Sequence, residues 1–161
     1  MYLLDANVFI EAKNFYYRFD TFPAFWDWLD AEQANGNLAS ARPIFEELTK
    51  GNDELSQWAR ERKDSGWFIP VDDSQTQQIF IDVAAWVMNG SFREHAKTDF
   101  LSGGDPWLIA RAISMGATVV THEKLVDRNI RRKVKIPNVC DAFGVECLDT
   151  FDLLNALGAR F

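Results

Sequence analysis

The chain has 161 residues, 47% hydrophobic and 14% aromatic, which suffices for one domain (residues 1–161) with a substantial core and is too little for two. Its net charge of −7 argues against a protein that coats nucleic acid through a basic face, but not against a nucleic-acid enzyme whose acids hold a metal ion. Two cysteines make no disulfide framework, Asp5 interrupts any apolar leader, and no apolar run approaches the roughly 20 residues of a membrane span. We therefore expect a cytoplasmic protein with no membrane segment.

The first predicted strand is the apolar run Tyr2–Leu4, and an acid follows it directly. Asp5 would stand at the carboxyl end of a parallel strand, where open α/β sheets keep their ligands. A carboxylate buried there is unfavourable unless a cation or a hydrogen-bond donor meets it. Asp5 could equally cap the following turn, with Asn7 closing an Asx-turn.

Helices and strands alternate through the middle of the chain. The elements expected are a helix with an aromatic stripe, a strand, two helices, a short extended piece and a long apolar helix, at 23–34, 38–41, 44–50, 53–63, 67–71 and 75–88. The stripe at 22–29 could pack in the core or dock a partner or a second copy. Because the helix at 75–88 is apolar on nearly every side, we expect it to be buried all round or covered by a partner.

The helix at 44–50 carries two neighbouring acids that point in different directions. At about 100° per residue, Glu46 faces away from the apolar side of the helix, whereas Glu47 lies on the flank of that side. Glu47 is therefore the acid that could face a site, although both could be solvated helix acids.

Two further acids come from the second half of the chain. Asp105 is expected at the N-cap of a helix with Pro106 in its first position, on the face turned toward the sheet, and capping alone would explain that pair. The strand at 117–121 ends just before Glu123. With a strand at 145–148 and a helix at 151–157, the alternation is that of a three-layer α/β/α sandwich with a short, mainly parallel sheet.

Five cations occur within eight residues between that strand and the last one. This segment is either a solvated surface or a patch that contacts phosphates. Its cations are Arg128, Arg131, Arg132, Lys133 and Lys135.

The four acids Asp5, Glu47, Asp105 and Glu123 could converge at one edge of the sheet. Two bare carboxylates about 5 Å apart repel by roughly 3 kcal/mol at an effective dielectric constant of about 20. Four together would protonate or bind a hard divalent cation, and oxygen ligands at a partly open site suit Mg²⁺ or Mn²⁺. Such a site can activate water for phosphodiester hydrolysis.

The same residues resemble the PIN-domain nucleases, which include the VapC-type toxins of toxin–antitoxin pairs. The matching segments, in order, are LLDANVFI at 3–10, ELTKG at 47–51, GDPWLIARA at 104–112 and ATVVTHE at 117–123. The resemblance implies that Asp5, Glu47 and Asp105 are the core metal-binding acids. It also implies that Asn7 and Thr121 support them, and it suggests a homodimer, because proteins of this family are often dimeric. Glu123 stands where these proteins commonly have Asp, which gives the fourth acid a longer arm.

We therefore expect a Mg²⁺- or Mn²⁺-dependent ribonuclease that acts as the toxin of a pair, with RNA as substrate and a protein antitoxin as partner. Glu123 would complete the metal site or orient water, and the basic segment would contact RNA phosphates. The alternative is a PIN-like binding or regulatory module that the altered fourth acid leaves inactive. A phosphatase with Asp5 as nucleophile fits less well, because Asn7 replaces the second acid of its D-x-D pattern.

Overall fold

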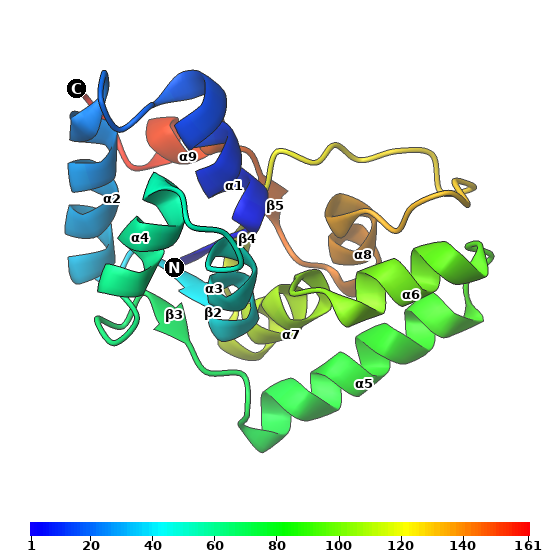
Figure 1. Ribbon diagram of the computed structural model, residues 1–161. Helices are drawn as coiled ribbons and strands as arrows, with labels where there is room; N and C mark the ends of the chain where they lie inside the picture. The colour runs from blue at the N-terminus through cyan, green and yellow to red at the C-terminus, as the bar shows by residue number, and fades with distance from the viewer.

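The computed structural model describes all of residues 1–161 and shows helices around one parallel sheet (Figure 1). The strands lie in the order β3-β2-β1-β4-β5, and every pairing between them is parallel, which confirms the predicted sheet. The first strand of the chain is therefore its central strand. The strand bounds are Tyr2–Leu4 (β1), Leu38–Ala41 (β2), Phe68–Ile69 (β3), Thr118–Val120 (β4) and Cys147–Leu148 (β5).

Helices flank this sheet, and α7 packs against both β2 and β4. The helix α5 packs on α7, and together with α6 it forms a hairpin that projects away from the sheet (lower right in Figure 1). None of the helices is long and apolar enough to cross a membrane. The helix bounds are Ala6–Glu11 (α1), Ala12–Tyr16 (the π-helical turn η1), Pro23–Ala34 (α2), Arg42–Leu48 (α3), Glu54–Glu61 (α4), Ser74–Asn89 (α5), Glu94–Ser102 (α6), Asp105–Met115 (α7), Ile136–Phe143 (α8) and Thr150–Ala156 (α9).

The hairpin of α5 and α6 differs from what the sequence suggested. The expectation that α5 is buried all round is wrong, because Ile81 and Met88 on its outer side are 57% and 52% exposed. The polar segment that forms α6 was not predicted as a helix. Its Lys97 is nevertheless buried, and the Lys97 ammonium donates a hydrogen bond to the Met88 carbonyl at the end of α5 (2.8 Å). A lysine stem can thus serve as an apolar contact while its charge meets a helix C-terminus.

Aromatic rings fill the core where α1, α4 and β3 meet. The centroid of Phe9 lies 5.5 Å from that of Trp58 and 5.8 Å from that of Trp67. Part of the aromatic stripe on α2 joins them, since Phe25 and Trp26 are buried, whereas Phe22 is 38% exposed. The core-packing interpretation of the stripe therefore holds for its inner side.

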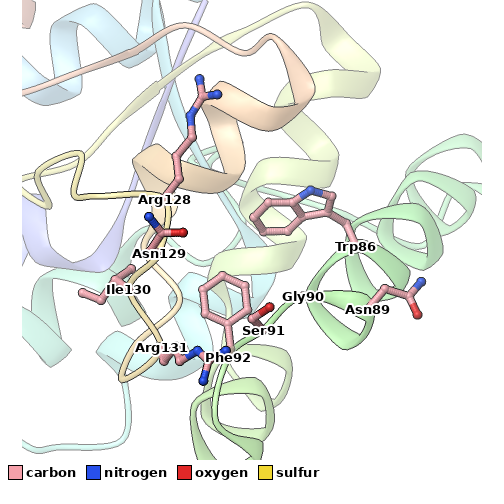
Figure 2. A pocket seen from close by; sticks show the side chains of 9 residues that line it. All are labelled: Trp86, Asn89, Gly90, Ser91, Phe92, Arg128, Asn129, Ile130 and Arg131. Carbon is pink, nitrogen blue, oxygen red and sulfur yellow. The ribbon is translucent and has the colours of Figure 1, made fainter.

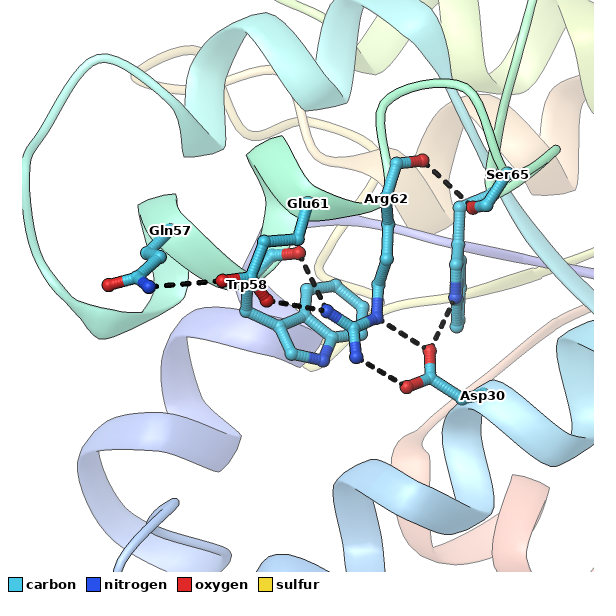
Figure 3. Close-up of polar contacts among 7 residues, drawn as sticks. Asp30, Gln57, Trp58, Glu61, Arg62 and Ser65 are labelled. Atoms are coloured by element: carbon cyan, nitrogen blue, oxygen red, sulfur yellow. Dashed lines mark hydrogen bonds and ion pairs between the residues drawn. The ribbon is translucent and has the colours of Figure 1, made fainter.

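One carboxylate on α2 connects this aromatic cluster to α4 (Figure 3). Asp30 accepts two hydrogen bonds from the Arg62 guanidinium, at 2.8 and 2.6 Å, and a third from the indole N–H of the buried Trp67, at 2.9 Å. The guanidinium carbon of Arg62 in turn lies 4.4 Å from the ring centroid of Trp58. Asp30 therefore orients two tryptophans, one directly and one through Arg62.

We expect Asp30→Ala to lower the free energy of unfolding by about 1–2 kcal/mol, because a buried indole N–H loses its acceptor and Arg62 loses its carboxylate. Chemical denaturation measures this difference. Asp27→Ala is the matched control, since Asp27 lies exposed on the same helix. Equal stability of the two variants would contradict the role assigned to Asp30.

Candidate functional site

Asp5 lies buried at the carboxyl end of β1, 1% exposed. Its backbone N–H donates to the carbonyl of Val120 on β4 (2.9 Å), which continues the pairing of the two strands. Its carboxylate accepts a hydrogen bond from the hydroxyl of Thr121 (2.8 Å). Asp5 occupies the N-cap position of α1, but its side chain accepts no capping hydrogen bond there. The capping alternative for Asp5 is therefore wrong, and Thr121 contacts the acid that it was expected to support.

Glu47 reaches the same region from α3. Its Oε1 accepts a hydrogen bond from the backbone N–H of Gly104, in the turn before α7 (2.7 Å). A Cβ at Gly104 would lie 2.8 Å from the Cδ1 of Ile44 and 3.2 Å from this Oε1. A side chain at Gly104 would therefore displace Ile44 or Glu47, a constraint that the sequence alone did not reveal.

Asp105 is the first residue of α7 rather than its N-cap, which is Gly104. The expectation of an Asp105 cap is therefore wrong, and its carboxylate is free for another use. Burial raises the pKa of Asp105 to about 8, with further contributions from the negative charges of Asp5, Glu47 and Glu123. Burial likewise raises the pKa of Asp5 to about 6, against the lowering effect of the Thr121 hydrogen bond. The acids therefore act on one another electrostatically.

Glu123 differs from the other acids because it already has cationic partners. Its side chain is 5% exposed, and its Oε1 accepts a hydrogen bond from the Lys133 ammonium (2.8 Å), with Lys135 at 3.7 Å. Its Oε2 accepts from the backbone N–H of Ile136, the first residue of α8 (2.8 Å). Glu123 therefore joins the end of β4 to the basic segment and to α8, contacts that sequence reasoning missed.

The remaining predicted residues are more loosely placed. Asn7 lies half-buried in the first turn of α1. In the basic segment, Arg128 pairs with Asp141 across the surface (3.0 Å), while Arg131 and Arg132 are exposed and form no ion pair. Of the five predicted phosphate contacts, Lys133 and Lys135 thus lie against Glu123, whereas the three arginines do not.

The donor set fits a hard divalent cation in chemistry, since it consists of carboxylates, and the negative charges of Glu47 and Glu123 help to raise the pKa of Asp5 and Asp105. It does not form a ready coordination shell: no group of three or more His, Cys, Asp or Glu side chains is placed to hold a metal ion. Rotation of the side chains would be needed to bring their oxygens to one point. The fit is therefore one of charge and donor type.

The parallel sheet of five strands flanked by helices is a PIN-like α/β fold, and two solved structures share it. The crystal structure of FitAcB from Neisseria gonorrhoeae gives a TM-score of 0.54 at 19% identity, over 92% of this chain and 96% of that chain. The crystal structure of VapBC2 from Rickettsia felis, bound to a DNA fragment from their promoter, gives 0.52 at 13% identity, over 92% and 97%. At such identities the likeness shows the fold alone.

The chain belongs to the family described as Domain of unknown function (DUF4411), which it matches over residues 2–161. No curated protein matches it significantly.

The buried acids predict an unusual pH dependence in the absence of divalent cations. In the folded protein Asp5 keeps its proton up to about pH 6 and Asp105 up to about pH 8. In an unfolded chain both carboxyls lose their protons at about pH 3.9. The folded state thus binds more protons in between, so the free energy of unfolding should fall from about pH 4 to about pH 8, by a few kcal/mol. Denaturation in a chelator across this range measures it.

Asp105→Asn is the matched variant for this measurement. It should be more stable than the wild type at about pH 8, and its stability should depend less on pH, because the group with the highest pKa is gone. A wild-type curve that rises over this range would contradict the burial of ionisable acids at the site.

Proposed function

We propose that the protein is a divalent-metal-dependent ribonuclease that hydrolyses RNA phosphodiester bonds. The observation that supports this proposal is that acids from the end of β1, from α3 and from α7 approach one another: Glu47 accepts a hydrogen bond from Gly104, the neighbour of Asp105, and the charges of Asp5 and Glu47 help to raise the pKa of Asp105. Burial of repelling carboxylates costs stability and is retained most readily where it serves function.

Asp5, Glu47 and Asp105 would hold Mg²⁺ or Mn²⁺, which supplies an activated water and neutralises charge on the phosphate. The hydroxyl of Thr121 fixes one oxygen of Asp5 through the hydrogen bond that it donates. Gly104 orients the carboxylate of Glu47 in the same way. The catalytic acids are thus held by donors that do not compete for the metal.

Glu123 takes a different part in this proposal. Its two oxygens are occupied by Lys133 and by the start of α8, so it holds the basic segment beside Asp105. The longer arm of Glu, compared with the Asp usual in PIN domains, serves this reach. A role for Glu123 in completing the metal site requires release of Lys133.

We further propose that the protein is the toxin of a toxin–antitoxin pair, with a protein antitoxin and a homodimeric assembly in the cytoplasm. Support comes from the resemblance of the four sequence segments to VapC-type toxins and from the shared fold with FitAcB and VapBC2. The exposed apolar side chains of α5, Ile81 and Met88, give a surface on which a partner chain could pack.

The first test is cleavage of RNA with Mn²⁺ or Mg²⁺ by the wild type, Asp5→Asn, Asp105→Asn and Glu47→Gln. Each substitution should lower the rate by at least about 100-fold. Loss of a residue that only supports a metal ligand costs up to about 100-fold, and loss of the ligand itself should cost no less. Glu46→Gln is the matched control, since Glu46 is exposed on the same helix and should keep full activity.

Circular dichroism and the shift of the melting temperature with Mn²⁺ complete this test. Stabilisation by Mn²⁺ that disappears in Asp105→Asn would support the metal site independently of any RNA substrate. A folded wild type that neither cleaves RNA nor gains stability from Mn²⁺ would favour the PIN-like binding module instead.

Glu123→Gln separates the two roles of the fourth acid. Because Lys133 and α8 lose a charged acceptor, we expect a free energy of unfolding lower by about 1–3 kcal/mol. The Mn²⁺ affinity should change less than in Asp105→Asn, as titration calorimetry would show. Loss of Mn²⁺ binding equal to that of Asp105→Asn would make Glu123 a direct ligand.

A further inference from the structure

A cavity of about 650 Å³ lies apart from the acids, between the end of α5 and the basic segment. Trp86 projects from α5 and Phe92 from the loop that follows it, and both approach the opposite wall formed by residues 128–131 (Figure 2). A smaller hollow shares Trp86, Phe92 and Arg128 and extends the space toward Asp141 on α8. Neither hollow includes any of the four predicted acids.

Two aromatic rings make the apolar part of this cavity. The centroids of Trp86 and Phe92 are 5.8 Å apart, with their planes tilted by 56°. The backbone of Gly90 lies so close to the Phe92 ring that a Cβ there would stand 2.9 Å from two ring carbons. Both aromatic residues are only half-buried, so part of their surface remains available to a flat ligand.

Arginines and amides make the polar part. Arg131 is exposed and unpaired, and its backbone is fixed because its carbonyl accepts a hydrogen bond from the N–H of Arg93 (2.9 Å). Arg128 lines the cavity beside its exposed ion pair with Asp141. The side chains of Asn89 and Asn129 add amide donors and acceptors. The cavity therefore offers positive charge, aromatic faces and hydrogen-bonding amides together.

The cations continue from this cavity toward the acids. The next residues, Arg132 and Lys133, line a separate hollow of about 250 Å³ together with Asp105. Arg131 and Arg132, which are adjacent in the chain, thus line two different hollows. A polyanion lying along this segment would meet the cavity at one end and the acids at the other.

We propose that the cavity binds single-stranded RNA outside the cleavage position, with a base against Trp86 and Phe92 and phosphates at Arg128 and Arg131. This inference rests on the proposed ribonuclease function and adds a second contact region to it. Base stacking on aromatic rings beside a cationic track is the general means by which proteins hold single strands without reading their sequence. An acidic peptide would satisfy the arginines but would leave the aromatic faces without a flat partner.

The test is the binding of a labelled single-stranded RNA of random sequence, followed by fluorescence anisotropy. All variants carry Asp105→Asn and are measured in a chelator, so that binding is separated from cleavage. Trp86→Ala and Arg131→Ala should each weaken binding about tenfold, and Trp86→Phe should restore most of the loss. Arg131→Ala should also lower the slope of log affinity against log salt by about 0.7, because one phosphate contact is lost.

Arg18→Ala is the matched control, because this exposed arginine pairs only with Asp20 and lies far along the chain from the cavity. It should leave the affinity unchanged, and Asp141→Asn should strengthen binding by removing a negative charge beside Arg128. Unchanged affinity in both Trp86→Ala and Arg131→Ala, or no RNA binding at all, overturns the inference.

The two proposals fail separately. A wild type that cleaves RNA while the cavity variants bind normally would retain the ribonuclease and remove the cavity. RNA binding that depends on Trp86 and Arg131, in a protein that shows no metal-dependent cleavage, would retain the cavity and remove the nuclease.

Discussion

Negative charge buried at the carboxyl end of β1 is the constraint on which the rest of the structure depends. Asp5 is removed from water and within the field of Asp105, and such burial is unfavourable without a compensating donor. The parallel pairing of β1 with β4 supplies one, because it brings the Thr121 hydroxyl to the Asp5 carboxylate. A shift of one residue in this pairing would turn Thr121 to the other face of the sheet. The hydrogen bond that stabilises the Asp5 carboxylate therefore depends on the register of β1 and β4.

The acids are compensated unequally, and this inequality indicates their roles. Glu47 receives a backbone N–H from Gly104, and Glu123 receives an ammonium and a backbone N–H. Burial and three negative neighbours raise the pKa of Asp105, and the positive charge of Lys133 opposes them only in part. Asp105 is therefore the acid with the most to gain from a bound cation, whereas Glu123 belongs as much to the architecture of the basic segment as to the site.

Much of the fold could be predicted because its signals are local. Short apolar runs predicted β1 and β4, and Asp53, Asp73 and Asp149 cap α4, α5 and α9 near the expected starts. The helix α6 was missed because its buried lysine counts as polar in any periodicity. The contacts of Glu123 were missed because they depend on how a segment without regular structure folds back, and no repeating pattern in the sequence reports that.

The central position of β1 has a consequence for how the protein is made. Asp5 is synthesised well before its hydroxyl partner Thr121, which lies 116 positions later in the chain. Closing so long a stretch of chain costs entropy that is recovered only when β4 docks, so contacts of this range form late in folding. An incomplete nascent chain therefore contains Asp5 and Glu47 without the strand that assembles them. Whatever chemistry these acids perform begins only after Thr121 has been synthesised and β4 has docked.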